Sequence, residues 1–415
     1  MPLFDVVVVG AGAAGLMSAI QAKVAGASEV LLLDTRIKIG AKILISGGTR
    51  CNVTNKKVVP SDYEGGTPYF IKHVLSAFSA DETRDFFASL GVELVLEPTG
   101  KYFPSTHSGK TILQALIRRG EQLGIRLKTG VRIIRVRKEG EFFALFDEGQ
   151  KKYEAKKVIL ATGGLSLPET GSDGMGYNIA KEFGHTLVET SPSLTPLLTD
   201  DAAWQSLSGV SLETELSFFA DGKKCASAKG PFLFTHFGYS GPVVLDISRY
   251  WIRAKRSDEP RIFANFIPQE KQEVWQKRIM EFSLERPHSR IKNFLTDEAA
   301  LPERFADVFL EKLNANGSLA VRKVKKSDLN RLIRELMHTL LAVTGDMGYK
   351  KAEVTAGGID LSEVEHSTMQ SKRVRGLYFA GEILDVDGRI GGFNFQWAWS
   401  SGTIAGKSAA KAPLS

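Results

Sequence analysis

A glycine-rich turn near the N-terminus limits the possible folds more than any other feature of this sequence. Residues 4–10 (FDVVVVG) form an apolar run, which is expected of a parallel strand buried on both faces. Gly10, Gly12 and Gly15 then follow in the spacing G-x-G-x-x-G, at the start of a small-residue helix predicted from Ala13 to about Ala25. Residues 28–34 (SEVLLLD) are predicted to form a second buried strand. The chain therefore opens with a predicted βαβ unit of the Rossmann type.

This unit has the residues needed to bind a dinucleotide. The glycines permit a tight turn and let a pyrophosphate approach the helix N-terminus closely. Asp34 ends the second strand, where a carboxylate can accept hydrogen bonds from both ribose hydroxyls of an adenosine. A purely structural glycine turn would not require the strand, helix and acid to fall in register. The predicted contacts are Gly10, Gly12, Ala13, Ala14, Gly15 and Asp34.

Three further stretches favour FAD over NAD as the dinucleotide. Residues 157–168 (KVILATGGLSLP) and 376–388 (GLYFAGEILDVDG) each place a strand before a glycine turn, as in flavoproteins with two dinucleotide-binding domains. Residues 388–402 (GRIGGFNFQWAWSSG) are predicted to open the last helix, with the amides of Gly392, Phe393 and Asn394 pointing out of its positive end. Negative charge on a reduced flavin would be stabilised there. The tryptophans are predicted only to anchor this helix in the core.

A polar loop between the second strand and the helical region supplies further donors. Residues 38–55 (KIGAKILISGGTRCNVTN) are expected to contact a pyrophosphate and a flavin ring through Lys42, Ser46, the Gly47 and Gly48 amides, Arg50 and Asn52.

The rest of the chain predicts an insertion in the nucleotide-binding domain. Helices are expected between residues 70 and 130, one beginning at a capping box on Ser79, and strands from Val131 onward. A proline-bearing segment, residues 191–197, begins a region of short strands that includes a predicted tight hairpin at Asp221-Gly222. Beyond Pro268 the pattern is helical; Ser327 is the expected N-cap of a helix whose buried face would comprise Leu329, Leu332, Ile333, Leu336 and Leu340. The predicted domains are 1–190 plus 346–415 for FAD and an insert at 191–345, mainly β at 191–267 and mainly helical at 268–345.

Composition limits the expected compartment, metal sites and partners. The two cysteines, Cys51 and Cys225, offer neither a disulfide framework nor a CxxC metal site, which favours a cytoplasmic protein with no metal. No apolar run reaches the about 20 residues that span a bilayer, so no membrane partner is expected. The formal net charge of +7 is compatible with a polyanionic partner, although charge alone favours a generically basic protein.

The runs at residues 42–55 (KILISGGTRCNVTN) and 380–402 (AGEILDVDGRIGGFNFQWAWSSG) resemble the signatures of one flavoprotein family. It includes aminoacetone oxidase, a BaiN-type bile-acid reductase and the flavin-dependent ribosomal RNA dihydrouridine synthase. The resemblance extends over nearly the whole chain and implies an α/β fold: a Rossmann-like, three-layer ββα FAD-binding domain interrupted by an insert that is part β-barrel-like and part helical.

The resemblance also implies where non-covalent FAD binds. Besides the residues above, it implies contacts at Cys51, Val131, Ala161, Thr162, Gly163, Gly381, Glu382, Asp385 and Gly391. An acid after the Gly376–Phe379 strand commonly holds the ribitol chain in such flavoproteins. Two positions depart from the usual pattern: Thr49 replaces a third glycine, which puts close backbone approach there in doubt, and Asp34 replaces the commoner glutamate.

Two side chains are candidates for proton transfer. His236 lies in residues 234–242 (FTHFGYSGP), a loop that the resemblance places over the flavin, and histidine titrates near neutral pH. It is interpreted as a general acid or a substrate clamp; the alternative is a structural histidine. Cys51 is the other candidate, although a buried thiol packed near the ring explains it as well. No second G-x-G-x-x-G follows a strand, so NAD(P)H is expected to dock transiently.

Three functions are compatible with these features. The leading hypothesis is NAD(P)H-dependent reduction of a C=C bond, with uridine of ribosomal RNA as substrate. It rests on the family resemblance and on basic residues that gather in residues 321–331 (VRKVKKSDLNR) and 249–256 (RYWIRAKR). A solvated helix face explains the first of these runs equally well. A small-molecule oxidase or reductase acting on an amine or a steroid-like enone is the second. A non-catalytic, flavin-containing RNA-binding factor is the third.

Overall fold

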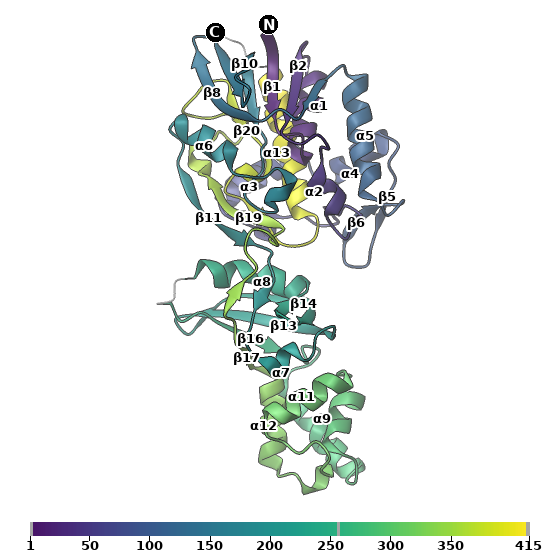
Figure 1. The fold of residues 1–415 in the computed structure, drawn as a ribbon. Coiled ribbons are helices and arrows are strands. Elements are labelled where there is room, and N and C mark those ends of the chain that lie inside the picture. Colours follow the sequence, from purple (N-terminus) through teal and green to yellow (C-terminus); the bar gives the residue numbers. More distant parts are fainter. Residues whose placement is uncertain (1–2, 255–257, 412–415) are drawn as a thin grey trace. The chain divides into compact units, whose positions relative to one another are not determined.

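The computed structural model describes residues 3–254 and 258–411, which form two compact units (Figure 1). Unit 1 comprises Met1–Pro192 and Glu353–Ser415, and unit 2 comprises Ser193–Ala352. Each unit has its own hydrophobic core.

The sheet of unit 1 is built on two central parallel strands, β1 (Leu3–Val9) and β10 (Lys152–Leu160). β2 (Val30–Asp34) pairs with the other edge of β1, and β7 (Arg126–Thr129) extends the sheet beyond it. The first half of β10 pairs with antiparallel β9 (Phe142–Asp147), which pairs with β8 (Ile133–Glu139), while its second half pairs with parallel β20 (Leu377–Phe379). This sheet confirms the predicted Rossmann-like fold.

Helices α1 (Ala13–Val24) and α13 (Phe393–Lys411) pack against one another beside this sheet. The remaining helices of unit 1 are α2 (Ala41–Ile45), α3 (Pro68–Ala77), α4 (Ala80–Ser89), α5 (Gly109–Gln122) and α6 (Met175–Glu182). The capping box predicted at Ser79 is confirmed, because its hydroxyl accepts from the Glu82 amide and the Glu82 carboxylate accepts from the Ser79 amide.

Smaller sheets complete unit 1. They are the pair β21 (Asp387–Gly388) and β4 (Tyr63–Glu64), the pair β11 (Leu187–Ser193) and β19 (Val354–Ile359), and the trio β3 (Thr54–Asn55), β6 (Lys101–Pro104) and β5 (Leu94–Leu96).

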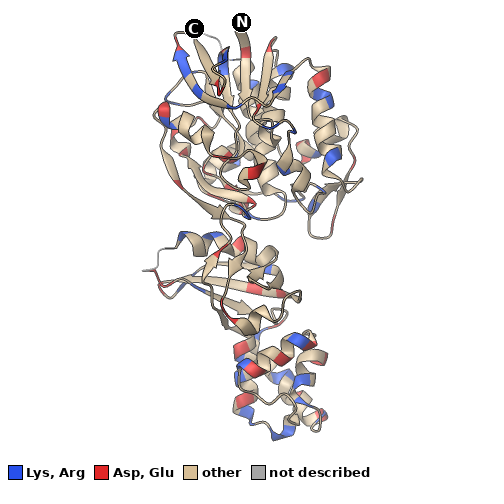
Figure 2. Ribbon diagram, in the orientation of Figure 1, with Lys and Arg blue, Asp and Glu red and all other residues tan. Residues whose placement is uncertain are grey.

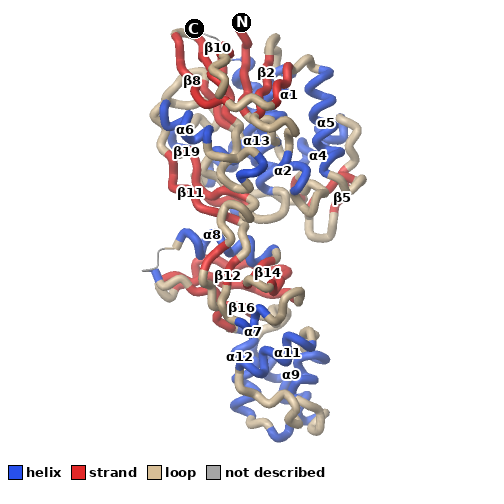
Figure 3. The backbone as a smooth tube through the Cα atoms, in the orientation of Figure 1, coloured by secondary structure: helices blue, strands red, loops and turns tan. Residues whose placement is uncertain are grey.

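Unit 2 contains an antiparallel sheet, whose strands, like all strands in Figure 3, are drawn in red. Its strands, in spatial order, are β17 (Thr339–Leu341), β16 (Arg261–Asn265), β13 (Ser211–Ala220), β14 (Lys223–Thr235), β15 (Gly238–Ser240), β12 (Leu197–Leu198) and β18 (Gly345–Asp346). The predicted hairpin is confirmed, since Asp221 and Gly222 join β13 to β14 with φ of +50° and +72°. Helix α8 (Pro242–Arg253) packs on β13 and β14.

The other α-helices described in unit 2 are α7 (Ala202–Gln205), α9 (Gln272–Glu285), α10 (Ile291–Asn293), α11 (Glu303–Lys312) and α12 (Lys326–Met337). A π-helix (Phe294–Glu298) follows α10, and a short 3-10 helix (Val321–Lys323) precedes α12. Two expectations for α12 are wrong. Its N-cap is Lys325 and not Ser327, and Leu340 lies in β17 with 53% of its surface exposed. The helix ends three residues earlier because the chain pairs with β16 there. Leu329, Leu332, Ile333 and Leu336 are buried as predicted. Among the residues described, no helix is long and apolar enough to cross a membrane.

Candidate functional site

The turn between β1 and α1 uses its three glycines in two different ways. A Cβ at Gly10, where φ is +103°, would lie 2.4 Å from the Ala161 carbonyl oxygen, and one at Gly15 would lie 1.7 Å from the Gly10 oxygen. The protein itself therefore requires these two glycines. A Cβ at Gly12, the N-cap of α1, would meet nothing within 4 Å. Gly12 leaves open space at a helix N-terminus, which is what an approaching phosphate needs.

Asp34, at the end of β2, is held beside this turn. Its Oδ2 accepts from the Ala11 amide at 2.6 Å and its Oδ1 from the Arg36 amide at 2.7 Å. Burial raises the pKa of this carboxyl, and the two amides oppose that effect in part. Val131 lies next to it, donating its amide to the Asp34 carbonyl oxygen at 2.9 Å. Each carboxylate oxygen retains a lone pair with which to accept from a hydroxyl.

Two buried polar atoms in the predicted cofactor residues have no hydrogen-bond partner among the described residues. They are Asn52 Oδ1 and Thr162 Oγ1. Asn52 adjoins Gly392, where an added Cβ would lie 2.8 Å from that same Oδ1. Since buried polar atoms normally find partners, Asn52 Oδ1, beside the start of α13, is an atom that a polar ligand could satisfy. Thr162 Oγ1 instead lies against Gly176, where an added Cβ would be 2.0 Å from it.

Backbone geometry around residues 46–52 is unusual for side-chain-bearing residues. Gly47, Gly48, Thr49 and Cys51 all have positive φ, with Thr49 at +70°. This explains the glycine common at that position, because a β-branched residue is strained in the left-handed region. A Cβ at Gly48 would meet nothing within 4 Å.

The side chains of this loop are engaged in different ways. Arg50 lies over the Phe103 ring at 3.9 Å and pairs with Glu97 at 2.6 Å. The Ser46 hydroxyl donates to the Ile43 carbonyl oxygen at 3.3 Å. The Cys51 thiol is fully buried, and desolvation raises its pKa to about 12, which makes it a poor proton donor.

A polar network joins this loop to the strand ends. The Lys42 ammonium lies 2.5 Å from Glu382 Oε2 and donates to Ser166 Oγ at 2.7 Å. The other oxygen of Glu382 accepts from Ser166 Oγ at 2.5 Å and from the Thr355 amide at 3.0 Å. Both oxygens of the acid expected at the ribitol are thus engaged with the protein. Ser166 and Thr355 are not predicted from the sequence, since no neighbouring residue indicates that they contact Glu382.

The N-terminus of α13 is shaped by the side chains around it. Asn394 holds the backbone of Gly388, accepting from its amide and donating to its carbonyl oxygen, both at 2.8 Å. Gly391 and Gly392 have φ of +135° and +91°. The first-turn N–H groups of a helix have no acceptor within it, so these amides are the groups this end can offer a ligand. The tryptophans anchor the helix: Trp397 donates to the Gly381 carbonyl oxygen and Trp399 to that of Val53.

Contacts between distant segments thus bring the predicted cofactor residues of unit 1 together. A Cβ at Gly381 would lie 2.7 Å from Ala14 Cβ, and one at Gly163 would lie 4.0 Å from Glu382 Oε2. The Asp385 amide donates to the Ile359 carbonyl oxygen, beside the same turn. Together with the Gly10–Ala161, Lys42–Glu382 and Asn52–Gly392 contacts, these connect the ends of β1 and β10 to the start of α13.

His236, the other candidate catalytic residue, belongs to unit 2. It is exposed in the turn between β14 and β15, with its ring 5.0 Å from that of Phe237. In the basic run at residues 249–256, Lys255 and Arg256 lie outside the described residues.

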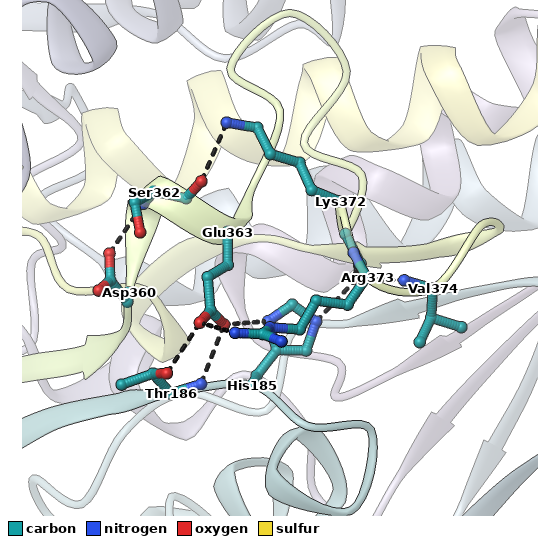
Figure 4. A network of polar contacts seen from close by, with 9 residues as sticks. His185, Thr186, Asp360, Ser362, Glu363, Lys372, Arg373 and Val374 are labelled. Atoms are coloured by element: carbon teal, nitrogen blue, oxygen red, sulfur yellow. Dashed lines mark hydrogen bonds and ion pairs between the residues drawn. The ribbon is translucent and has the colours of Figure 1, made fainter.

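A further network in unit 1 has the order of a catalytic triad (Figure 4). His185 Nε2 lies 2.7 Å from Ser371 Oγ, and its Nδ1 lies 3.0 Å from Glu363 Oε2. Ser371 is only 3% exposed, and its oxygen also accepts from the amides of Arg373 and Val374. The buried serine cannot meet a substrate, so this network is structural: it joins the chain before β11 to the loop before β20.

Comparison with known proteins identifies the family. Residues 4–408 match the family model described as HI0933-like protein Rossmann domain. The chain is 32% identical to a 3-dehydro-bile acid delta(4,6)-reductase of Clostridium scindens, over 98% of this chain and 99% of that protein. It is 34% identical to a ribosomal RNA dihydrouridine synthase of Escherichia coli K12, over 97% and 96% respectively.

Among solved structures, the Mycobacterium smegmatis Sdh1 complex in the apo form has a similar fold, with a TM-score of 0.50 and 16% identity over 98% of this chain and 68% of that chain. The family match spans nearly all of the sequence, as its motifs predict. The chain therefore belongs to the HI0933-like Rossmann family, the family of flavoprotein oxidoreductases whose signatures it carries.

Proposed function

We propose that this chain binds FAD non-covalently in unit 1 and uses it to reduce a C=C bond. The observation that carries the proposal is the open space at Gly12, together with the partnerless Asn52 Oδ1 beside Gly392. In this proposal the Gly10–Gly15 turn binds the pyrophosphate and Asp34 the adenosine ribose. The Lys42–Asn52 loop, residues 161–163, residues 381–385 and residues 391–394 surround the rest of the cofactor.

FAD supplies hydride chemistry when bound; the protein contributes orientation and charge. The helix end at Gly392 favours negative charge nearby, worth about 0.3–1 kcal/mol when exposed and more when partly buried. Lys42 adds a cation that Glu382 and Ser166 hold in one place. The side-chain carboxamide of Asn394 already binds the backbone of Gly388. The backbone N–H of Asn394 is therefore the group offered to the flavin.

Unit 2 is proposed to present the substrate, and uridine of ribosomal RNA is the leading candidate. The 34% identity with a ribosomal RNA dihydrouridine synthase supports this substrate. NAD(P)H is the proposed hydride donor. His236, exposed and on a turn, is a better candidate for the proton donor than Cys51, whose thiol is buried with a pKa of about 12.

A small-molecule reductase is the second candidate, favoured by the 32% identity with a bile-acid reductase over almost the whole chain. Its substrate would be a steroid-like enone, and it would be indifferent to RNA. A flavin-containing RNA-binding factor without catalysis would bind RNA but would not be reduced by NAD(P)H.

An anaerobic half-reaction separates these functions. We expect NAD(P)H to bleach the flavin band of the purified protein. Unmodified ribosomal RNA should then restore the oxidised band and yield dihydrouridine. Restoration by an enone or by oxygen, with no response to RNA, would establish the small-molecule function instead. A His236→Ala protein that retains FAD and full turnover would exclude His236 as the proton donor.

A further inference from the structure

We infer that one end of the helical part of unit 2 is the surface on which the RNA backbone docks. This basic surface consists of His288, Arg290, Arg322, Lys323, Lys325 and Lys326. The inference rests on the proposed RNA substrate, and it goes further by assigning the binding to six residues from two separate turns.

Backbone hydrogen bonds hold the two turns together. The Arg322 amide donates to the Pro287 carbonyl oxygen at 3.3 Å, and the Val321 amide donates to that of Ser289 at 2.8 Å. Arg290 forms an isolated β-bridge with Ala320, and Ile291 donates to Leu319 at 3.0 Å. Residues 288–290 therefore lie directly beside residues 320–322, although the sequence separates them by about 30 positions.

The cations of this surface are exposed and lack acidic partners. Within the part of the chain that the structure describes, no ion pair involves Arg290, Arg322, Lys323, Lys325 or Lys326. Nearby cations differ: Arg286 pairs with Asp297 at 3.5 Å, and Lys292 lies 2.8 Å from Glu303. Unpaired cations are the ones that can bind phosphate without first losing a carboxylate.

The packing of α12 determines which side of the helix is left for charged side chains. Leu329, Leu332, Ile333 and Leu336 bury one face of the helix in the core of unit 2. Residues 319–334 contain six lysines and arginines and a single acid, Asp328. In Figure 2 the chain entering α12 is correspondingly blue. Asp328 is the one negative charge within this segment, and it lies at the helix start, where it faces the positive end of the dipole.

The chemistry favours a nucleic-acid backbone over an acidic protein. A protein interface of ordinary size has an apolar centre. Here the exposed large apolar side chain next to the cations in the chain is Leu319, at 38%, which is too little apolar surface for such a centre. Contacts to phosphates position an RNA without reading its sequence. The surface is therefore assigned to affinity and not to the choice of uridine.

Neutralisation of four cations tests this assignment. In the full-length, FAD-loaded protein, the variant Arg322→Gln/Lys323→Gln/Lys325→Gln/Lys326→Gln is compared with the wild type for binding to a fluorescein-labelled, unmodified ribosomal RNA hairpin. We expect affinity to fall roughly tenfold or more. The negative slope of log affinity against log salt should become shallower by roughly 3, since each phosphate contact contributes about 0.7–0.9 to its magnitude. In turnover, KM for the RNA should rise while kcat changes little.

Two further variants control for loss of charge in general. Neutralising Lys110, Arg118, Lys128 and Lys181, all exposed on unit 1, should leave the RNA affinity within about twofold of the wild type. Lys323→Arg/Lys325→Arg/Lys326→Arg keeps the charge and should retain affinity. Equal losses in the unit 1 variant, or an unchanged affinity and salt slope in the quadruple variant, would overturn the assignment.

The binding assay is independent of the proposed reaction. If RNA binding depends on these residues but RNA does not reoxidise the flavin, the proposed reaction is wrong and the assignment of the docking surface is still supported. If the quadruple variant instead loses binding to phosphatidylserine vesicles while its RNA affinity is unchanged, the surface serves a membrane and the inference is wrong.

Discussion

At the scale of single residues, the glycines of the β1–α1 turn separate cofactor binding from folding. A Cβ at Gly12 meets no protein atom, whereas one at Gly15 would lie 1.7 Å from the Gly10 oxygen. We expect Gly12→Ala to keep the free energy of unfolding within about 0.5 kcal/mol but to weaken FAD binding tenfold or more, about 1.4 kcal/mol. Gly15→Ala should destabilise even the FAD-free protein by about 1–3 kcal/mol.

Chemical denaturation of the FAD-free proteins and fluorescence titration with FAD measure the two effects. Full FAD affinity in Gly12→Ala would show that the open space at Gly12 is not where the cofactor approaches.

His185 makes the stability of unit 1 depend on pH. Its imidazole is fully buried, and desolvation lowers its pKa below the ordinary 6.5, even though Glu363 opposes this shift. In the unfolded chain the ring takes up a proton near pH 6.5 while the folded ring resists. The stabilisation is therefore present above pH 6.5 and is lost as the pH falls, by at most about 1.4 kcal/mol per pH unit.

The measurement is the free energy of unfolding at pH 7.5, 6.5 and 5.5 for the wild type and His185→Asn. The variant should show the shallower slope. Glu363, whose pKa the Arg373 guanidinium lowers to about 2, contributes in a separate window below pH 4.5. Identical slopes in the two proteins would mean that His185 does not titrate differently on folding.

At the scale of elements, glycines also set how closely α13 packs on α1. A Cβ at Gly402 would lie 2.6 Å from the Ala14 carbonyl oxygen, and one at Gly406 would lie 2.3 Å from that of Ser18. Gly406→Ala should therefore push the helices apart and cost about 1–3 kcal/mol of stability. Because both helices present their N-termini to the proposed cofactor site, FAD affinity should fall as well. Lys407→Ala, on an exposed neighbour, is the control for both measurements, and equal behaviour of the two variants would contradict the close-packing argument.

Sequence patterns predicted the elements whose signals are local. The G-x-G-x-x-G turn, the Ser79 capping box and the Asp221-Gly222 hairpin each depend on a few adjacent residues, and all three form. The predicted end of α12 was wrong, because pairing of β17 with β16, a tertiary contact, overrides the helical pattern at Leu340. Long-range side-chain contacts could not be predicted for the same reason. Nothing near Lys42 in the sequence indicates that Ser166 and Glu382 will bind its ammonium group.

At the scale of the whole molecule, every proposed FAD contact lies in unit 1, while unit 2 has a separate core. A ligand stabilises the part whose unfolding releases it, by about 2.7 kcal/mol at a hundredfold excess over Kd. Hydrogen exchange should therefore slow on FAD addition for amides of β1 and β2, such as Val7 and Leu31. Amides of β13 and β14, such as Leu216 and Phe232, should exchange at the same rate with and without FAD. Equal slowing in both sets would mean either that the units unfold together or that unit 2 also holds the cofactor. Either outcome would contradict the prediction that the cofactor stabilises unit 1 alone.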